Sequence, residues 1–307
     1  MLKINVLIIT YKQEKLISRA LDSILCQKEW GLNKIVICDD NSPDNNWEVI
    51  QDYYARYPHI ICAYRNSENI GIYRNAEKRI ALRGQADLYI RMAGDDAICD
   101  GYLESLQKFC EDKSDVIRGH SVAIYSDWKN VCPDGTEILR SNSAIANSSS
   151  PVSLKIRGMI CNRSVAVSEL LLSRFRPIDQ SKGLSWAETQ FDLQTQTMSD
   201  INYYCSCVGS IYYSGIGIST KMQTLHYYKE NILKYSLMLE HYELSSKDRE
   251  YVKYHMFYYK YIVYRKLSCL FKSRLAYWKS LDSLLEYRLL PSIKSIYRMI
   301  KTAYTTN

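Results

Sequence analysis

The stretch RMAGDDAI, residues 91–98, places two adjacent carboxylates, Asp95 and Asp96, at the end of an apolar run. Like charges side by side are costly unless water, a cation or a metal-bound phosphate offsets them. An acidic, solvated turn explains the pair as well as a ligand site does. The surrounding elements must decide between these two interpretations.

The first hundred residues alternate strand and helix patterns. INVLIIT at 4–10 is a continuous apolar run, which is typical of a strand buried on both faces. Three further strands are expected at 34–40, 59–65 and 87–92. The strands are separated by helical patterns at 14–27, 45–57 and 72–83. Strands alternating with helices of this length predict an α/β fold with a mainly parallel sheet.

Ligands bind at the carboxyl ends of the strands in such sheets. Each of the four predicted strands is followed by polar residues, namely Thr10 and Tyr11, Asp39 and Asp40, Asn66, and Asp95 and Asp96. These residues are expected at one edge of the sheet. The shared edge favours a ligand site over an incidental acidic turn.

The sequence excludes two common phosphate-binding motifs. IITYKQEK follows the first strand without any glycine, which excludes the dinucleotide-binding turn, and no glycine-framed loop ends in the lysine of a P-loop. Carboxylates at strand ends suggest a different device, a Mg²⁺ or Mn²⁺ ion that Asp95 and Asp96 hold against a diphosphate.

Four segments in this order resemble the family-2 glycosyltransferases of the GT-A fold, a Rossmann-like sheet flanked by helices: INVLIITYKQEKLISRALDSILCQ, KIVICDDNSPDNN, NSENIGIYRNAEKRIAL and YIRMAGDDAI. The resemblance covers residues 3–110 well and continues less clearly to about residue 225. It implies an inverting transfer of a sugar from a nucleotide-diphosphate donor, with a divalent cation as cofactor.

The resemblance also implies roles for individual residues. Thr10 and Tyr11 match the pair whose tyrosine flanks the nucleobase, and Asp39 matches the aspartate that accepts a hydrogen bond from uracil. The segment that closes over the nucleotide is matched by Asn69, Gly71, Arg74 and Asn75. Structural interpretations stay open: Asp39 and Asp40 would cap a helix, Tyr11 would pack in the core, and Arg74 would be a solvated helix charge.

Two departures from the family pattern affect the metal site and the first turn. Asp95 matches the second aspartate of the D-x-D motif, but Ala93 stands in the place of the first. Lys12 stands where the family usually has asparagine. The number of carboxylates that hold the metal is therefore open.

The catalytic base should be an acid late in the domain. SWAETQFDLQ resembles the start of the family's acidic helix, in which Glu188 matches the glutamate and Thr189 replaces the aspartate. We expect Glu188 to deprotonate the acceptor hydroxyl, with Asp192, one helical turn along, as the second candidate. The alternative is that Glu188 caps its helix.

The remaining chain is less regular. We expect strand material at 116–128, a mobile loop at 140–153, a helix around 164–175 and paired strands at 201–220. The predicted division is a GT-A domain at 1–228, made of a nucleotide-binding half at 1–110 and an acceptor-side half at 111–228. A helical basic extension follows at 229–307.

The net charge of +7 is concentrated in the C-terminal region. Residues 247–307 carry thirteen lysines and arginines against four acidic residues, whereas the first 246 carry 27 basic and 29 acidic side chains. Basic residues interleaved with tyrosine can stack on single-stranded nucleic acid, lie on an anionic membrane or form a packing element. With a glycosyltransferase upstream we expect peripheral membrane contact or a packing role, and no nucleic acid.

The ten cysteines lie in apolar surroundings, which favours reduced thiols in a cytoplasmic protein. The basic region would place such a protein at the inner face of the plasma membrane. Cys205 and Cys207 form a C-x-C pair without a second pair at zinc spacing. No uncharged run is long enough to span a bilayer.

The sequence therefore predicts a metal-dependent hexosyl- or N-acetylhexosaminyltransferase. We expect a UDP-sugar donor and a glycan or lipid-linked saccharide acceptor in bacterial surface polysaccharide synthesis, such as capsule or O-antigen. The alternatives are a GDP- or dTDP-sugar donor, or a non-catalytic module that binds sugar nucleotides or glycans.

Overall fold

The computed structural model describes residues 1–216, 224–271 and 279. Contacts divide the chain into two compact units, Met1–Ile178 with Gln190–Lys221 and Asp179–Thr189 with Met222–Asn307. The boundary expected at residue 228 falls inside a helix, and residues 179–189 group with the C-terminal helices.

The first unit contains one sheet in the strand order β3-β2-β1-β4-β8-β6-β9-β5, with β7 paired to β6. Its parallel half consists of the four strands that the sequence predicts, β1 (Ile4–Thr10), β2 (Leu32–Asp39), β3 (Ile61–Arg65) and β4 (Leu88–Ala93). The carboxyl ends of these strands therefore meet at one edge, as expected.

The second half of the sheet is mixed. It is formed by β5 (Ala97–Ile98), β6 (Val122–Val131), β7 (Glu137–Arg140), β8 (Val165–Ser168) and β9 (Ile201–Tyr213). β8 joins the halves by pairing antiparallel with both β4 and β6, and β9 runs parallel to β6. The short β5 pairs with β9 directly after the acidic turn.

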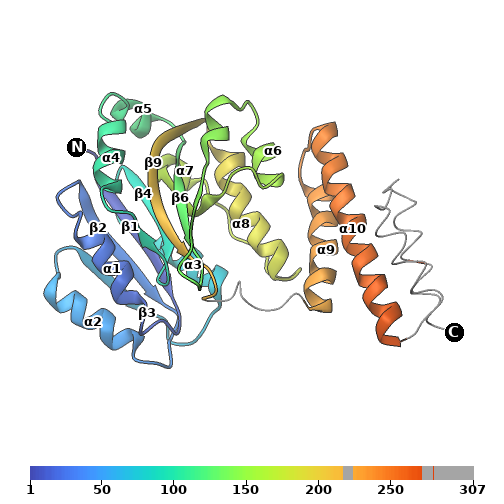
Figure 1. Cartoon of the computed structure of the whole chain (residues 1–307). Helices are drawn as coiled ribbons and strands as arrows, with labels where there is room; N and C mark the ends of the chain where they lie inside the picture. The colour runs from blue at the N-terminus through green and yellow to red at the C-terminus, as the bar shows by residue number, and fades with distance from the viewer. Residues whose placement is uncertain (217–223, 272–278, 280–307) are drawn as a thin grey trace. The chain divides into compact units, whose positions relative to one another are not determined.

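Helices cover both faces of this sheet (Figure 1). One core cluster contains side chains of α1 (Ile17–Leu25), α2 (Asn46–Arg56), α4 (Tyr102–Phe109) and α5 (Ser114–Gly119). The opposite cluster contains side chains of α3 (Ile72–Ala81), α7 (Glu169–Ser173) and the end of α8 (Leu184–Met198). Alternate residues of β1 point to the two clusters, so hydrophobic burial on both faces fixes the strand's register.

Two local predictions are wrong, and a third lies partly outside the described residues. The helix expected around 164–175 is strand β8 followed by the short α7, because Ser168 ends the strand and its hydroxyl caps the helix at the Leu171 N–H. Of the paired strands expected at 201–220, the structure shows one, β9; residues 217–220, where a second strand would lie, are outside the described residues. The loop expected at 140–153 contains a 3₁₀ turn, η1 (Ser143–Asn147), and the start of α6 (Pro151–Ile156), which Ser150 caps.

The second unit contains the helices α9 (Leu225–His241) and α10 (Ser246–Phe271). They pack through aromatic rings, since Tyr259 of α10 contacts Tyr228 and Tyr235 of α9 at ring-centroid distances of 5.9 and 5.8 Å. Within the described ranges no helix is both long and apolar enough to cross a bilayer. Most of the predicted basic extension beyond residue 271 lies outside the described residues.

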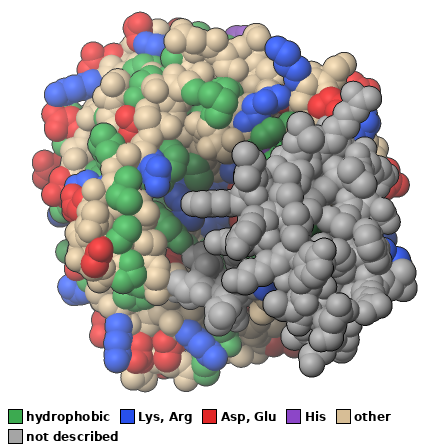
Figure 2. Space-filling view, turned by 45° about the vertical axis from the view of Figure 1, so that its right-hand side comes forward, with side chains coloured by type: hydrophobic (Ala, Val, Ile, Leu, Met, Phe, Trp, Pro, Cys, Tyr) green, Lys and Arg blue, Asp and Glu red, His purple; other side chains and the backbone are tan. Residues whose placement is uncertain are grey.

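On the face seen in Figure 2, acidic and basic side chains are scattered among one another, with hydrophobic side chains in small groups between them. This mixture agrees with the nearly balanced charge of the first 246 residues.

Candidate active site

The acidic turn follows β4 and lies against the end of β1. The Gly94 N–H donates to the Ile9 carbonyl at 2.9 Å, and the Asp96 N–H donates to the Ala93 carbonyl at 3.2 Å. A Cβ atom on Gly94 would lie 2.6 Å from Gln13 Oε1 and 3.0 Å from Thr10 Oγ1. Glycine is therefore required for the close approach that sets Asp95 and Asp96 beside the polar end of β1.

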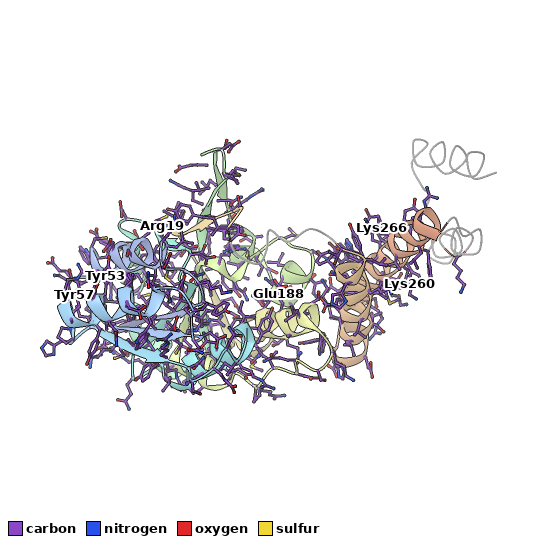
Figure 3. The ribbon with its side chains drawn as sticks, turned by 90° about the horizontal axis from the view of Figure 1, so that it is seen from below. Arg19, Tyr53, Tyr57, Glu188, Lys260 and Lys266 are labelled. Carbon is purple, nitrogen blue, oxygen red and sulfur yellow. The ribbon has the colours of Figure 1, made fainter. Side chains whose placement is uncertain are left out.

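Two arginines flank the acidic turn, and each stacks on a tyrosine from the end of β9. Arg19 of α1 (labelled in Figure 3) donates to the Asp95 carbonyl at 2.5 Å, and its guanidinium carbon lies 3.4 Å from the centroid of the Tyr213 ring. Arg163 of η2 (Asn162–Ser164) lies 3.9 Å from the Asp96 carboxylate and 3.3 Å from the centroid of the Tyr212 ring. The stacking restricts both guanidinium groups before any ligand binds.

Burial raises the pKa of Asp96 to about 7, and the neighbouring Asp95 carboxylate contributes to the rise. Arg163 and the Tyr213 N–H oppose it only in part. A metal cation bound by the two carboxylates would offset this repulsion, because Arg19 and Arg163 offset it only in part.

The oxygen donors of Asp95 and Asp96 suit Mg²⁺ or Mn²⁺. Within the part of the chain that the structure describes, no cluster of three or more His, Cys, Asp or Glu side chains could hold a metal. A divalent ion at this turn would therefore complete its coordination with water and ligand phosphate, which is the usual arrangement for Mg²⁺.

Asp39, at the end of β2, is completely buried and organises the loop that follows. Its carboxylate accepts hydrogen bonds from the Ser42 N–H and hydroxyl at 3.0 and 2.5 Å and from Asn46 Nδ2 at 2.7 Å. Arg65 Nε lies 3.5 Å away. A nucleobase would reach Asp39 only if this network opened. The network orders the loop before α2 and does not cap that helix, because the N-cap residue is Asn45 and the N–H that donates to Asp39 belongs to Ser42.

Asp40 anchors the segment that contains Asn69 and Gly71. It is 3% exposed, and its carboxylate accepts from the Ile70 N–H and the Gly71 N–H, both at 2.9 Å. Asn69 Nδ2 donates to the Asp40 carbonyl at 3.3 Å, and Gly71 has the positive φ of 86° that favours glycine. The carboxylate therefore fixes the start of α3 beside the end of β2.

Arg74 lies exposed in the first half of α3. Among the described residues its guanidinium has no hydrogen-bond or ion-pair partner. The side chain is available to a ligand or to solvent. Asn75, one residue further, is buried and donates to the Cys38 carbonyl at 2.9 Å, so it holds α3 on the sheet.

The turn after β1 presents Tyr11 and buries Thr10. Thr10 Oγ1 lies 2.8 Å from Gln13 Oε1 and 3.2 Å from Asn46 Oδ1, whereas the Tyr11 ring is 40% exposed. Lys12 has a left-handed φ of 57°, and its N–H donates to Ser42 Oγ at 3.0 Å. Asparagine, which the family resemblance implies at this position, tolerates a left-handed backbone better than lysine does.

The short helix η2 connects Asp192 with the acidic turn. Asn162 Nδ2 donates to the Asp192 carbonyl at 2.5 Å, and the next residue, Arg163, faces Asp96. The Asp192 carboxylate lies 2.7 Å from Lys155 Nζ. Glu188 is exposed on the part of α8 that belongs to the second unit, where Figure 3 labels it. Of the two candidate bases, Asp192 is therefore the one that belongs to the same unit as the acidic turn.

Two further arginines lie inside the first unit. Burial lowers the pKa of Arg79 to about 9, and Arg79 Nη1 donates to the Leu7 and Met92 carbonyls at 3.1 and 3.0 Å. Burial likewise lowers the pKa of Arg91 to about 10; it donates to Thr195 Oγ1 at 2.9 Å, and Asp192 opposes the shift. Arg79 and Arg91 thus place positive charge close to the carboxyl end of β4.

Three basic residues of the site, Arg19, Arg163 and Lys155, are not indicated by the sequence. Each contacts an acidic residue more than 35 positions away, so no local pattern reveals the contact. Ser42 was visible in the segment KIVICDDNSPDNN, and its contact with Asp39 was predictable from the three-residue spacing of a capping turn.

The model of one protein family, described as Glycosyl transferase family 2, matches residues 5–155. These residues contain β1 to β4, the acidic turn and the Asp39 network. Residues 5–155 of the chain therefore belong to glycosyl transferase family 2.

Similar proteins agree with this family. Poly(ribitol-phosphate) beta-glucosyltransferase of Bacillus spizizenii is 32% identical over 122 residues, which are 38% of this chain and 19% of that protein. The first curated relatives are matched over only 26% of their own length.

Two solved structures share the fold. Staphylococcus aureus TarS 1–349 in complex with UDP-GlcNAc is 15% identical with a TM-score of 0.61, and the match covers 93% of this chain and 80% of that chain. The mannosyltransferase PcManGT of Pyrobaculum calidifontis, in complex with GDP-Man and Mn²⁺, is 11% identical with a TM-score of 0.57, covering 99% and 80%. At these identities the likeness establishes the GT-A fold alone.

Proposed function

We propose that this family-2 chain transfers a sugar from a nucleotide-diphosphate donor to a glycan acceptor with inversion at the anomeric carbon. The observation that carries the proposal is the acidic turn, because Asp95 and Asp96 lie at the ligand-binding edge with Arg19 and Arg163 beside them. Paired carboxylates and fixed guanidinium groups match a metal-bound diphosphate.

In the proposed complex, Asp95 and Asp96 hold a Mn²⁺ or Mg²⁺ ion. When bound, the ion supplies Lewis-acid stabilisation of the departing diphosphate. Arg163 adds positive charge on the same side, and the exposed Tyr11 ring and Arg74 guanidinium are available to the nucleotide. Asn69 and Gly71 contribute by fixing the start of α3 on Asp40. Thr10 and Asp39 support the same edge through the Ser42 and Asn46 network.

Inversion needs one base that takes the proton of the acceptor hydroxyl as its oxygen attacks the anomeric carbon. Asp192 is our first candidate, because η2 connects it to the acidic turn and Lys155 orients its carboxylate. Glu188, one turn earlier on α8, is the second. This order reverses the sequence-based preference.

For the donor we propose a UDP-sugar of the hexosyl or N-acetylhexosaminyl type. The structure of TarS with UDP-GlcNAc supports this choice, and that of PcManGT with GDP-Man keeps a GDP-sugar as the alternative. The acceptor we propose is a glycan or lipid-linked saccharide of a bacterial surface polysaccharide. The similarity to a poly(ribitol-phosphate) beta-glucosyltransferase supports a surface polymer.

We also propose that the protein works in the cytoplasm at the inner face of the membrane. On α10, Lys260 Nζ lies 4.6 Å from the centroid of the Phe257 ring, and Lys266 Nζ lies 5.3 Å from that of Tyr228 on α9 (Figure 3 labels both lysines). Tyr254 and Tyr258 of the same helix are 40% and 42% exposed. Basic and aromatic side chains together favour contact with an anionic lipid surface.

The test is turnover of UDP-, GDP- and dTDP-sugars with and without Mn²⁺, with release of free nucleotide as the signal. We expect metal-dependent hydrolysis of one donor class, lost in Asp95→Ala and kept in Asp100→Ala, an exposed aspartate of the same region. Binding of a nucleotide without hydrolysis of any donor would instead indicate the non-catalytic module.

A further inference from the structure

Cys205 and Cys207 lie two residues apart on β9 with their sulfur atoms 3.4 Å from each other. Residues i and i+2 of a strand point to the same face, which places both thiols on the side of the α1 and α4 core. The β6–β9 register shifts between Tyr125 and Trp128, opposite this part of β9. Such an irregularity bends a strand, and here it accompanies the close approach of the two thiols.

The two thiols differ in their surroundings. Cys205 is 4% exposed within the core, whereas Cys207 is half-buried and its Sγ lies 3.6 Å from Ser126 Oγ. The hydrogen bond with Cys205 lowers the pKa of the Cys207 thiol. Cys207 is therefore the nucleophile of the pair and Cys205 the resolving thiol.

A cavity of about 440 Å³ gives small molecules access to Cys207. Its lining includes Cys207, Cys99 and Lys129. A small oxidant such as hydrogen peroxide fits this volume.

The same strand supports the candidate active site. Three and four residues after Cys207, Ser210 and Ile211 pair with Ile98 and Ala97 of β5, directly after the acidic turn. Tyr212 and Tyr213 then stack on Arg163 and Arg19. A covalent change at Cys205 and Cys207 therefore acts on the strand that holds both flanking arginines.

We propose that Cys205 and Cys207 are a reversible oxidation site that forms a C-x-C disulfide on reaction with hydrogen peroxide. The Cys207 thiol gives up its proton, and the thiolate attacks one oxygen of the peroxide as the O–O bond breaks. This leaves a sulfenic acid on Cys207, and the departing hydroxide takes up the thiol proton to form water. Cys205 sulfur then attacks the sulfenic sulfur, its proton leaves with the hydroxyl as a second water, and the S–S bond forms. Two thiols are oxidised and one peroxide is reduced to two waters.

The test uses the full chain with Cys26→Ser, which removes the thiol that is exposed among the described cysteines. The protein is treated with peroxide, its free thiols are blocked, and its peptides are analysed by mass spectrometry. We expect the peptide with Cys205 and Cys207 to be two hydrogens lighter and to carry no blocking group. Dithiothreitol should restore both free thiols. In Cys205→Ser the disulfide is absent and a dimedone adduct appears on Cys207. Free, blockable thiols at both positions after oxidation, or a Cys99–Cys207 disulfide, would overturn the proposal.

The consequence for the active site rests on the proposed function and is measured separately. We expect oxidation to raise the dissociation constant of the donor nucleotide by about fivefold or more, the lower end of coupling between two sites. Cys132→Ser, as the control, is expected to respond to peroxide as the parent does. If the disulfide formed without any change in nucleotide affinity, the oxidation site would stand, but its coupling to the acidic turn would be refuted.

Discussion

The Arg163 guanidinium lies 3.9 Å from the Asp96 carboxylate and is held against the Tyr212 ring at 3.3 Å. The acidic turn thus carries its own partial counter-ion, supplied by an element 67 residues later in the chain. Because Arg163 neutralises part of the negative charge of Asp96, a bound metal ion needs to neutralise only the remainder.

Replacing Arg163 by Gln is expected to weaken nucleotide-diphosphate binding by about tenfold, because a charge-assisted hydrogen bond contributes roughly 1.5–3 kcal/mol. Titration calorimetry with the nucleotide in the presence of Mn²⁺ measures this effect. Arg140→Gln, which removes an exposed arginine of β7, is the control and should bind as the wild type does. Equal affinity in Arg163→Gln would remove Arg163 from the donor site.

The raised pKa of Asp96 makes stability depend on pH. The pKa of this carboxyl is near 3.8 in the unfolded chain and about 7 in the folded one, so the folded state binds more protons between these values. Stability from this group is complete below about pH 4 and is lost as the pH rises through 7. A tenfold difference in proton affinity between the two states corresponds to about 1.4 kcal/mol.

Urea unfolding across pH 4–8 checks this sign. Asp96→Asn should remove the corresponding part of the decline while leaving the rest of the profile unchanged. If the wild type and Asp96→Asn gave parallel profiles, Asp96 would not titrate in this range. Since protons compete with a metal for the carboxylate, Mn²⁺ affinity should rise between pH 6 and 8.

Asp40→Ala is expected to cost about 3 kcal/mol of unfolding free energy, because it leaves the Ile70 and Gly71 N–H groups and Asn66 without their buried acceptor. Chemical denaturation measures the loss. Asp52→Ala, at an exposed position of α2, should stay within about 0.5 kcal/mol of the wild type. A similarly small effect in Asp40→Ala would contradict the anchoring role.

Lys12→Asn is expected to stabilise the protein by roughly 1 kcal/mol, because a left-handed backbone costs most L-residues about 1–2 kcal/mol and asparagine tolerates it. The melting temperature measures the gain. Lys15→Asn, at an exposed position without positive φ, should give no gain. If both variants behaved alike, strain at Lys12 would not be the cause.

Asp192→Asn is expected to lower kcat by about 10² to 10⁴, the usual contribution of a general base, while donor binding is kept. Glu188→Gln should reduce it far less. Steady-state kinetics on both variants decide between the two candidates. Loss of turnover in Glu188→Gln with normal turnover in Asp192→Asn would restore the order that the sequence suggests.

The parallel half of the sheet was predictable because strong local patterns define it. The apolar run at 4–10 indicates a strand buried on both faces, and the amphipathic pattern of α1 indicates a helix on one face of the sheet. The parallel direction of the strands and their shared polar edge followed from the alternation of strands and helices, whereas the strand order β3-β2-β1-β4 did not. The mixed half was less predictable. β8 was mistaken for part of a helix since Val165–Val167 and Leu170–Leu172 form one apolar stretch, and only pairing with β4 and β6 separates them.

The candidate site was predictable in its acidic residues and not in its basic ones. Asp95 and Asp96 are adjacent in sequence, and Gly94 marks the close approach to β1. Arg163 reaches the turn only through the tertiary fold, and the Asp192 backbone meets Asn162 for the same reason. Long-range contacts of this kind leave no periodicity in the sequence.

Metal-assisted nucleotide binding at the acidic turn can be measured as thermal stabilisation by UDP, GDP, CMP and dTDP, each with and without Mn²⁺, in the wild type and in Asp95→Ala. A ligand at about 100 times its dissociation constant adds roughly 2.7 kcal/mol of stability. We predict a shift with UDP that requires Mn²⁺ and disappears in Asp95→Ala. No shift with any nucleotide, or an equal shift in Asp95→Ala, would contradict a metal-assisted nucleotide site at this turn.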